Sequence, residues 1–373
     1  MPYKDTFLDK KLDERSAGNF LRSLSVKKGL IDFCSNDYLG ISTRQFLSDD
    51  SVQQYNHGAK GSRSLSGNSK LAEDTESLIA AFHDADAALL FNSGYNANTG
   101  ILGSVPQRSD IIFFDALSHA SIRDGVRLSL AQSYSFAHND LNDLEDKLKL
   151  HTPNESRNVF VATETVFSMD GDLAPIEGLV SLCEKYGAHL IIDEAHAIGV
   201  VGDKGEGLVQ QLGLHHQVFA RIYTYGKAPG CHGAAIAGSY KLRSYLINFA
   251  RSFIFTTALP EIAIKAIAKS YGIFPGMKSE REQLKSLIEY FQRQEFPFEK
   301  LQSKTPVQGL IIPGNIEVKN IAAIMEMNGF DIRPILYPSV PKGKERLRIS
   351  LHAFNAEDQI LKMTNILNQS SLK

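Results

Sequence analysis

The sequence predicts an α/β protein with a mostly parallel sheet in a large domain and a smaller α+β domain towards the C-terminus. Short apolar runs, typical of buried strands, alternate with longer stretches of helical spacing through the middle of the chain. From about residue 275 the pattern changes, because helical stretches there precede shorter strand-like runs. The 373 residues suit about two domains, and we expect an N-terminal segment 1–40, a large domain 41–274 and a small domain 275–373.

The individual elements follow from the spacing of the apolar residues. After a short polar helix within the first 30 residues, residues 69–84 have the apolar spacing of a helix. The continuous apolar run Ala87–Phe91 then predicts a buried strand. The other predicted strands are 110–115, 158–166, 189–192, 218–224, 234–238, 309–312 and 346–351, and the other predicted helices are 95–102, 119–130, 176–186 and 280–292.

Composition argues against several classes of protein. Hydrophobic residues make up 43% of the chain, the net charge is −2, and no block of Lys and Arg stands out, so nucleic acid and anionic membranes are not expected partners. Cys34, Cys183 and Cys231 lie far apart, so we expect neither a disulfide framework nor a metal site. The charged N-terminal residues and the lack of an 18-residue apolar run predict a cytoplasmic protein without a signal peptide or membrane span.

The stretch Asp193-Glu-Ala-His196 has the spelling of a helicase ATPase box. Such an ATPase also needs a phosphate loop in which Gly-Lys is followed by Ser or Thr, so that a hydroxyl can hold magnesium. The chain has two Gly-Lys pairs, at Lys227 and Lys344, and they are followed by Ala and Glu. A DEAH-box ATPase therefore stays only a distant alternative.

Strand ends offer a different chemistry. Asp193 and Lys227 each follow a predicted strand, and Phe91 runs into Asn-Ser-Gly-Tyr95 at the start of a helix. Ligands of parallel sheets bind at the carboxyl ends of the strands, and a helix N-terminus is a ready phosphate site. A lysine for a Schiff base, a carboxylate for a pyridine nitrogen and a phosphate cradle together suit pyridoxal 5′-phosphate. His119 could stack on its ring and His196 could reach its phenolic oxygen.

Each of these residues also has a purely structural interpretation. Asp193 could cap a helix, Lys227 could be an exposed turn lysine, and the two histidines could be hydrogen-bonded structural residues. The Ser-Gly before Tyr95 could be an ordinary turn between strand and helix. The cofactor prediction depends on all of these residues falling at strand ends in one α/β region.

The chain resembles the α-oxoamine synthases, pyridoxal-phosphate enzymes of fold type I, over nearly its whole length. Each motif is weak alone, but their common order is specific. The motifs are Cys34-Ser-Asn-Asp-Tyr-Leu-Gly40, Gly61-Ser-Arg-Ser-Leu-Ser-Gly67, Phe91-Asn-Ser-Gly-Tyr95, Ser118-His-Ala-Ser121, Thr163-Glu-Thr-Val-Phe-Ser-Met-Asp-Gly-Asp172, Asp193-Glu-Ala-His196, Thr224-Tyr-Gly-Lys227 and Arg346-Leu-Arg-Ile349.

The resemblance implies a role for particular residues. Lys227 carries the cofactor as a Schiff base, Asp193 pairs with the ring nitrogen and His119 stacks on the ring, with Lys227, His119 and His196 as the catalytic residues. The remaining cofactor contacts that the resemblance implies are Ser168 and His196 at the phenolic oxygen, Gly94, Tyr95 and Thr224 at the phosphate, and Thr256, from a segment that the partner subunit usually lends. The implied substrate contacts are Arg348, which clamps the amino-acid carboxylate, together with Arg22, Ser339 and Asn36.

The reaction implied by the resemblance joins an amino acid to an acyl thioester with loss of carbon dioxide, in a homodimer with shared active sites. The likeness is greatest to the family member of biotin synthesis, which implies L-alanine and a pimeloyl thioester of coenzyme A or acyl carrier protein. Glycine C-acetyltransferase, 5-aminolevulinate synthase and serine palmitoyltransferase share the cofactor motifs and stay open as alternatives. A non-catalytic partner subunit is a further alternative, against which the intact Lys227 argues.

The chain departs from the family pattern at three places. Gly58-Ala-Lys-Gly-Ser62 stands where a Gly-Ser-Gly-Gly-Ser stretch is usual, and Ala72 stands where a histidine is usual. After the lysine, Ala228-Pro-Gly-Cys-His232 replaces a glycine-rich run. The family uses these sites on the approach of the acyl thioester, so they bear on the substrate more than on the cofactor.

Overall fold

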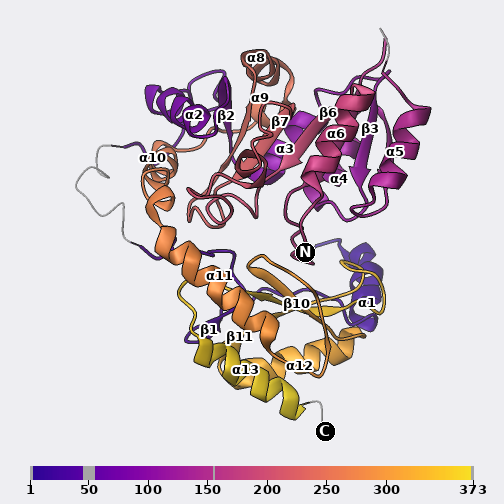
Figure 1. Cartoon of the computed structure of the whole chain (residues 1–373), viewed down its shortest axis with the longest axis vertical. Coiled ribbons are helices and arrows are strands. Elements are labelled where there is room, and N and C mark those ends of the chain that lie inside the picture. The colour runs from indigo at the N-terminus through magenta and orange to yellow at the C-terminus, as the bar shows by residue number, and fades with distance from the viewer. Residues whose placement is uncertain (1–2, 45–54, 154–155, 371–373) are drawn as a thin grey trace. The chain divides into compact units, whose positions relative to one another are not determined.

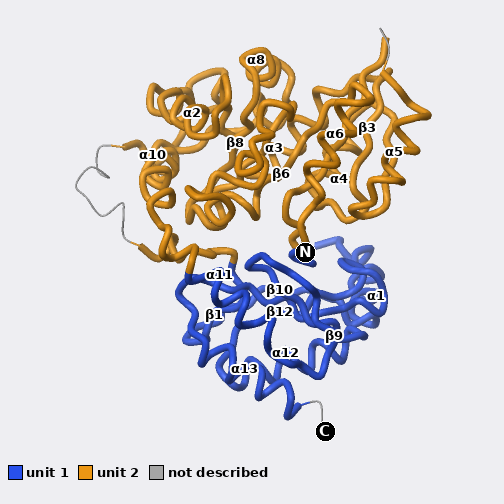
Figure 2. Tube along the Cα trace, in the orientation of Figure 1, with its two compact units in different colours: residues 1–35, 169–171, 283–373 blue, residues 36–168, 172–282 orange. Residues whose placement is uncertain are grey.

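The computed structural model describes residues 3–44, 55–153 and 156–370. Contacts divide the chain into two compact units, coloured differently in Figure 2. The smaller unit comprises Met1–Ser35, Met169–Gly171 and Gln283–Lys373, and the larger comprises Asn36–Ser168 and Asp172–Glu282. The N-terminal residues are thus grouped with the C-terminal ones, and the three-part division into 1–40, 41–274 and 275–373 stays a prediction.

A seven-stranded sheet forms the centre of the larger unit, with the strand order β2-β8-β7-β6-β5-β3-β4 (Figure 1). Strand β8 runs antiparallel to both of its neighbours, and all the other neighbouring pairs are parallel. The mostly parallel α/β fold predicted from the sequence is therefore confirmed. The strands are β2 (Ala87–Phe91), β3 (Ile111–Asp115), β4 (Gln132–Phe136), β5 (Val159–Glu164), β6 (His189–Asp193), β7 (Ala220–Thr224) and β8 (Ala234–Gly238).

The interior strands are mostly apolar because helices cover both faces of the sheet. Ile191 of β6 belongs to one hydrophobic core cluster, and its neighbours Leu190 and Ile192 belong to the other, as the alternation of side chains along a strand requires. The helices of this unit are α2 (Lys70–Phe82), α3 (Gly94–Leu102), α4 (Ala120–Leu128), α5 (Leu141–Leu150), α6 (Ile176–Tyr186), α7 (Leu208–Gln211), α8 (Tyr240–Phe249), α9 (Arg251–Ile254) and α10 (Glu261–Ser270), with the short turn η3 (Phe274–Gly276).

The smaller unit is built on a four-stranded antiparallel sheet of order β12-β13-β10-β9 and on a separate parallel pair, β1 with β11. Helix α11 (Lys278–Arg293) crosses the division between the units. The other elements are η1 (Thr6–Leu8), α1 (Asp9–Ala17), β1 (Ile31–Asp32), β9 (Glu299–Lys300), β10 (Val307–Ile311), α12 (Asn315–Met327), β11 (Phe330–Asp331), β12 (Arg333–Ile335), β13 (Arg346–Ser350) and α13 (Glu357–Ser370).

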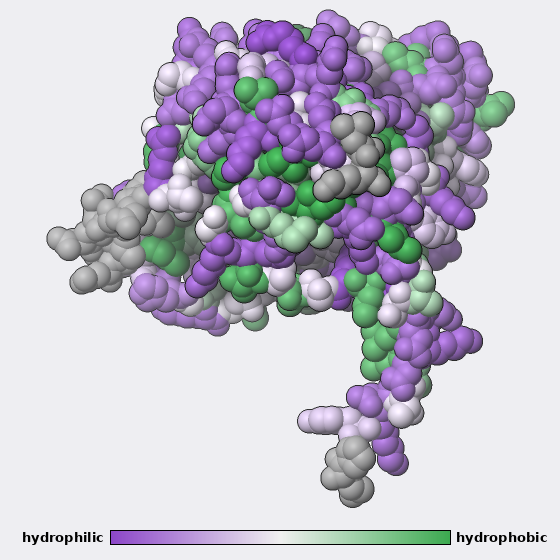
Figure 3. Space-filling view, turned by 90° about the horizontal axis from the view of Figure 1, so that it is seen from below, coloured by the Kyte–Doolittle hydropathy of each residue, from purple (hydrophilic) through white to green (hydrophobic). Residues whose placement is uncertain are grey.

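The surface shown in Figure 3 is largely hydrophilic, with hydrophobic residues grouped between the polar ones. Helix α1 has no buried residue, which agrees with the polar N-terminal helix expected from the sequence. Three large apolar side chains near it in the sequence, Phe7, Leu24 and Val26, are at least three-quarters exposed. Of the helices that the structure describes, none combines the length and the apolar character needed to cross a membrane.

Candidate active site

A cavity of about 110 Å³ lies at the carboxyl ends of the strands of the large sheet. Its wall is formed by residues that follow, or end, strands β2, β3, β5, β6 and β7. Six residues that the sequence singled out meet here. The lining residues are Gly94, Tyr95, Asn98, His119, Ser121, Glu164, Asp193, Ala195, Thr224 and Lys227.

Asp193 ends strand β6 and is only 5% exposed. The backbone N–H of Ala195 donates to its Oδ1 at 2.9 Å, and Asn98 Nδ2 donates to its Oδ2 at 2.7 Å. Because a carboxylate only accepts hydrogen bonds, the contact fixes which end of the Asn98 amide faces Asp193. Both carboxylate oxygens are therefore held by donors in the wall of the cavity.

A chain of hydrogen bonds runs from Asp193 to His119. Asn98 Nδ2 also donates to Ser121 Oγ at 3.0 Å, and Ser121 Oγ lies 2.7 Å from His119 Nδ1. The backbone N–H of Ser121 donates to the same Nδ1 at 3.2 Å, so Nδ1 acts as an acceptor and a neutral ring carries its proton on Nε2. Burial, with the Lys227 charge, lowers the pKa of His119 against the opposing charge of Asp193. The imidazole is consequently neutral at pH 7.

Asn98 itself has an unusual environment. It is 1% exposed on α3, and its Oδ1 is buried without a hydrogen-bond partner in the described part of the chain. An unpaired buried acceptor costs about 1–3 kcal/mol. Such a group in a polar cavity is typical of a functional site rather than of a core.

Glu164 is a second carboxyl group in the cavity wall. It ends β5 directly opposite Asp193 on β6, is 2% exposed, and accepts the backbone N–H of His119 at 2.6 Å. Burial, reinforced by the negative charge of Asp193, raises the pKa of Glu164 to about 8. Glu164 is therefore mostly protonated at neutral pH and adds little negative charge to the cavity.

Glu194, the second letter of the Asp-Glu-Ala-His stretch, has a structural environment. Its fully buried carboxyl group accepts the backbone N–H groups of Leu208 and Val209 at 3.1 and 2.8 Å and the hydroxyl of Thr165 at 2.9 Å. Burial raises its pKa to about 7. Glu194 thus ties the end of β6 to α7, whereas the neighbouring Asp193 lines the cavity.

The N-terminus of α3 makes one end of the cavity. Ser93 caps the helix by accepting the backbone N–H of Asn96 at 3.2 Å. A Cβ on Gly94 would lie 2.3 Å from Thr224 Oγ1, so only glycine lets the end of β7 approach the helix this closely. The hydroxyl of Thr224 and the free N–H groups of the first helical turn together suit an anion. The Tyr95 hydroxyl donates to Asp124 at 2.5 Å while the residue lines the cavity.

His196 and Ser168 do not line this cavity. His196 is 4% exposed, and its Nδ1 lies 2.7 Å from the Tyr38 hydroxyl, which in turn donates to Asn36 Oδ1 at 3.1 Å. Because a hydroxyl has one hydrogen to give, this geometry has Nδ1 of His196 donating to Tyr38. Asn36 thus belongs to the larger unit and supports His196 through Tyr38, while its contact with substrate stays a prediction.

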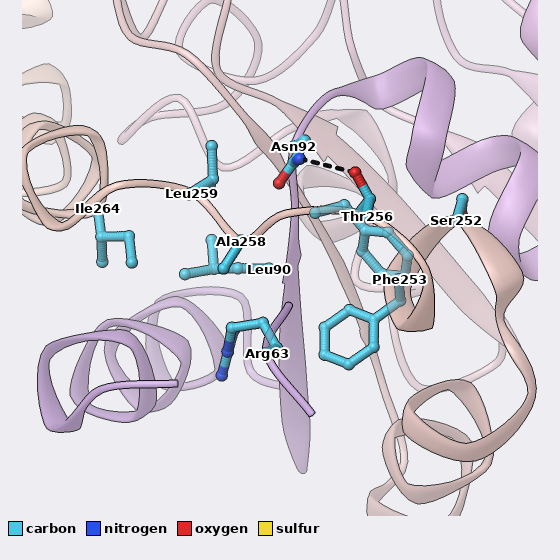
Figure 4. Close-up of a pocket in the computed structure, with 10 residues that line it drawn as sticks. Arg63, Leu90, Asn92, Ser252, Phe253, Thr256, Ala258, Leu259 and Ile264 are labelled. Atoms are coloured by element: carbon cyan, nitrogen blue, oxygen red, sulfur yellow. Dashed lines mark hydrogen bonds between the residues drawn. The ribbon is translucent and has the colours of Figure 1, made fainter. Parts of the chain in front are cut away.

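Thr256 lies at a different pocket, drawn in Figure 4. Asn92 Nδ2 donates to Thr256 Oγ1 at 3.3 Å and to the carbonyl oxygen of Thr257 at 2.7 Å. Thr256 is thereby held next to the residue that precedes the Ser93 cap, and not in the wall of the Lys227 cavity. A phosphate contact of Thr256 across a dimer stays a prediction.

The remaining predicted substrate residues belong to the smaller unit. Arg348, on β13, is 9% exposed and its Nη1 donates to Ser350 Oγ at 2.8 Å. Arg22 Nη2 donates to Ser339 Oγ at 3.1 Å, and both residues line a cavity of about 420 Å³ that also includes Arg15. Two of the predicted substrate residues are thus adjacent, in a pocket with two guanidinium groups.

A further charged network lies at the end of β3. His138 Nδ1 contacts Asp115 at 2.9 Å and His138 Nε2 contacts Asp172 at 2.8 Å. Burial alone would lower the pKa of His138, but the hydrogen bonds with these two carboxylates raise it to about 10. The imidazolium therefore links the β3 end to the residue that closes the Thr163–Asp172 motif.

The site also contains four residues that the sequence did not indicate as site residues: Tyr38, Asn98, Ser121 and Glu164. The spacing in the sequence could have indicated Asn98, because it lies four residues after Gly94 and so on the same face of the helix. Glu164 had a sequence signal too, since it ends an apolar strand as Asp193 does.

The residues of the cavity fit pyridoxal phosphate. A lysine amine, a buried carboxylate, a stacking imidazole and a helix N-terminus converge there, and the unpaired Asn98 Oδ1 is a further hydrogen-bond acceptor.

Comparison with known proteins gives consistent matches. The family model for class I and II aminotransferases matches residues 28–363. The chain is 39% identical over 363 residues to 8-amino-7-oxononanoate synthase of Emericella nidulans, covering 88% of this chain and 86% of that protein. It is 39% identical over 358 residues to the enzyme of the same name from Lysinibacillus sphaericus, covering 95% and 92%.

Solved structures agree with the sequence matches. Serine palmitoyltransferase from S. paucimobilis, with a bound PLP–myriocin aldimine, superposes with a TM-score of 0.88 at 23% identity, covering 100% of this chain and 99% of that one, and this likeness shows the fold alone. The 8-amino-7-oxononanoate synthase from Francisella tularensis has a TM-score of 0.79 at 28% identity, covering 93% and 99%. The chain therefore belongs to the class I and II aminotransferase family, in which it is a pyridoxal-phosphate-dependent acyltransferase of the α-oxoamine synthase type.

Proposed function

We propose that the protein condenses L-alanine with a pimeloyl thioester to give 8-amino-7-oxononanoate, carbon dioxide and the free thiol. One observation carries the choice of substrates: two relatives of that name, from Emericella nidulans and Lysinibacillus sphaericus, are 39% identical over most of the chain. In the reaction a carbon–carbon bond replaces the thioester carbon–sulfur bond, and the thiol leaves. The carboxylate of alanine departs as carbon dioxide, and a proton takes its place.

Lys227 would hold the cofactor covalently, and Asp193 would pair with its ring nitrogen. Gly94 and Tyr95, at the N-terminus of α3, and Thr224, at the end of β7, would hold its phosphate. When bound, pyridoxal phosphate supplies an electron sink for the charge left on the α-carbon of the amino acid. The donors from Ala195 and Asn98 support this assignment because they hold the Asp193 carboxylate facing the cavity.

The chain's own groups then handle the protons. Lys227, once its amine is free, takes the α-proton of alanine and later returns a proton to the product. A neutral His119 keeps a proton on Nε2 for the condensation. That N–H can donate to the thioester carbonyl oxygen as the carbon–carbon bond forms. His196 would contact the phenolic oxygen of the cofactor, and Tyr38 would hold the imidazole ring of His196.

Arg348 would grip the carboxylate of the amino acid through two parallel hydrogen bonds, which a lysine cannot reproduce. Such a grip sets the α-carbon–hydrogen bond perpendicular to the cofactor ring. The pimeloyl chain ends in a carboxylate, and the pocket lined by Arg22 and Ser339 offers guanidinium groups for it. The methyl group of alanine is worth only about 1–3 kcal/mol of discrimination against glycine.

Steady-state rates with a panel of substrates test the proposal. Alanine with pimeloyl-CoA should give the highest kcat/KM among pairings of alanine, glycine and serine with pimeloyl-, acetyl- and palmitoyl-CoA. Faster turnover of glycine with acetyl-CoA, or of serine with palmitoyl-CoA, would replace the substrate assignment and leave the cofactor assignment in place. Parallel assays with pimeloyl-acyl carrier protein identify the carrier.

Two measurements test the residues and the dimer. Borohydride reduction of the holoenzyme followed by peptide mapping should label the Lys227 peptide, and label on a different lysine would refute its role. For the homodimer with shared sites, inactive Lys227→Ala and Thr256→Val chains should recover part of the activity when mixed. If subunits exchange by an independent criterion and activity does not return, the site lies within one chain.

A further inference from the structure

Asp84, His215 and His216 gather outside the proposed active site. Asp84 lies in the turn between α2 and β2, and the two histidines lie in the loop between α7 and β7. Strands β2 and β7 run in the same direction, because both are antiparallel to β8. Both loops precede their strands, so the cluster lies at the amino ends, on the opposite edge of the sheet from Lys227.

Two distances within the cluster are close to those between ligands in a metal coordination sphere. Asp84 Oδ2 lies 3.0 Å from His215 Nε2 and 3.3 Å from His216 Nε2, and all three ligand atoms lie within 4.8 Å of one another. Ligands bound to zinc at about 2.0–2.1 Å in a tetrahedron are roughly 3.3 Å apart. The two contacts to Asp84 therefore need to change by only a few tenths of an ångström to accept an ion between them.

The surroundings leave the three side chains available to an ion from solvent. The side chains of Asp84 and His216 are 67% and 70% exposed. That of His215 is 14% exposed, so its position in the cluster is the most restricted. When Nε2 of His215 binds a metal, the proton of the neutral ring resides on Nδ1, which is buried without a partner in the described part of the chain.

We propose that Asp84, His215 and His216 bind one divalent transition-metal ion of the zinc type, with a fourth position open to water. Two imidazoles and one carboxylate are a ligand set that suits zinc and its neighbours, and not magnesium or calcium, which prefer oxygen ligands. The ion would join two loops that are 131 residues apart in the sequence. Its role would be to fasten the amino ends of β2 and β7, independently of the chemistry at the opposite edge.

The test uses the holoenzyme after treatment with a chelator. Isothermal titration with Zn²⁺, and optical titration with Co²⁺, should give one site per chain, with the intense visible bands of tetrahedral cobalt. His216→Ala and Asp84→Asn should each weaken binding by at least about 10- to 100-fold, which is the loss seen when only an outer-shell partner of a metal site is removed. Asp84 has a left-handed backbone (φ 45°) that asparagine also tolerates, so Asp84→Asn is expected to fold.

The matched control is His57→Ala, which removes an exposed histidine elsewhere on the larger unit. That variant should bind Zn²⁺ and Co²⁺ as the unmodified protein does. The proposal is wrong if the unmodified protein takes up no stoichiometric ion, or if Asp84→Asn and His216→Ala bind as tightly as the control. The trio would then be a hydrogen-bonded surface cluster that ties the two loops without a metal.

Discussion

Replacing Asn98 with leucine should separate cofactor binding from stability. In the structure Asn98 gives one donor contact to the Asp193 carboxylate, at 2.7 Å, and one to Ser121. A hydrogen bond to a charged group is worth about 1.5–3 kcal/mol. Without it the carboxylate is held by the Ala195 N–H alone among the contacts described above, so its charge and its orientation towards the cofactor nitrogen are both less well maintained.

The same substitution removes an unfavourable feature. Asn98 Oδ1 is buried and unpaired, which costs about 1–3 kcal/mol, and a leucine of similar shape has no such atom. The loss and the gain are of similar size, so the free energy of unfolding of the apoprotein should change little. Its Tm is expected to stay within about 4 °C of the unmodified protein.

Cofactor affinity should respond much more strongly. A loss of 1.5–3 kcal/mol corresponds to a Kd for pyridoxal phosphate that is roughly 10- to 150-fold higher. Absorbance or fluorescence titration of the apoprotein measures this Kd, and calorimetry measures the Tm. Thr99→Val is the control on the same helix, because it removes a hydroxyl that bonds the Tyr95 carbonyl and does not contact Asp193. Unchanged cofactor affinity in Asn98→Leu would refute a supporting role for Asn98.

Three further substitutions test other contacts. Gly94→Ala places a methyl group against Thr224 Oγ1, and the overpacking cost of about 1–3 kcal/mol should raise the Kd for pyridoxal phosphate up to about 100-fold in titrations of the apoprotein. The pKa of His138 is raised by its two carboxylate partners, so the charged imidazole stabilises the folded protein by at most about 5 kcal/mol. This contribution is complete below pH 6.5 and is lost as the pH approaches 10. The free energy of unfolding of His138→Gln should therefore be far below that of the unmodified protein at pH 6, and the two values should converge near pH 10. The pKa of Glu164 is also raised, so the unmodified apoprotein should lose stability between about pH 4.5 and 8, because in this range the carboxyl group ionises in the unfolded chain and stays protonated in the folded one. Glu164→Gln keeps an acceptor for the His119 N–H and does not ionise. A variant no more stable than the unmodified protein at pH 9 would contradict the buried, protonated state.

Apolar spacing predicted the interior elements well, because burial on both faces leaves continuous apolar runs. The predicted helix 176–186 coincides with α6, and the run Ala87–Phe91 coincides with β2. Strand β4 has no such signal, since it lies at the sheet edge and four of its five residues are exposed. Strand β4 is instead held in the sheet by its pairing with β3, which its own sequence does not indicate.

The residues of the candidate site likewise differ in whether the sequence alone could predict them. Asp193 and Lys227 could be placed at one edge of the sheet from the sequence, because the carboxyl ends of parallel strands lie together. The raised pKa of Glu164 could not be predicted, because it arises from the burial of the carboxyl group and from β5 lying next to β6 with Glu164 opposite Asp193. The Asn98 contact likewise depends on how α3 packs on the sheet, and hydrophobic patterning does not fix the orientation of one amide.

The departure from the family pattern after Lys227 leaves the position of the lysine intact. Lys227 lies in the connection between β7 and the antiparallel β8, which is closed by backbone hydrogen bonds from Tyr225 to Gly233 and from Gly230 to Lys227. Gly230 has a φ of 67°, and a Cβ there would lie 2.6 Å from the backbone nitrogen of Ser42. The turn thus retains a glycine at a position where the left-handed backbone and the close packing both require one. Alanine, proline and cysteine elsewhere in this stretch do not disturb that requirement, so the altered residues bear on what reaches Lys227 rather than on where Lys227 lies.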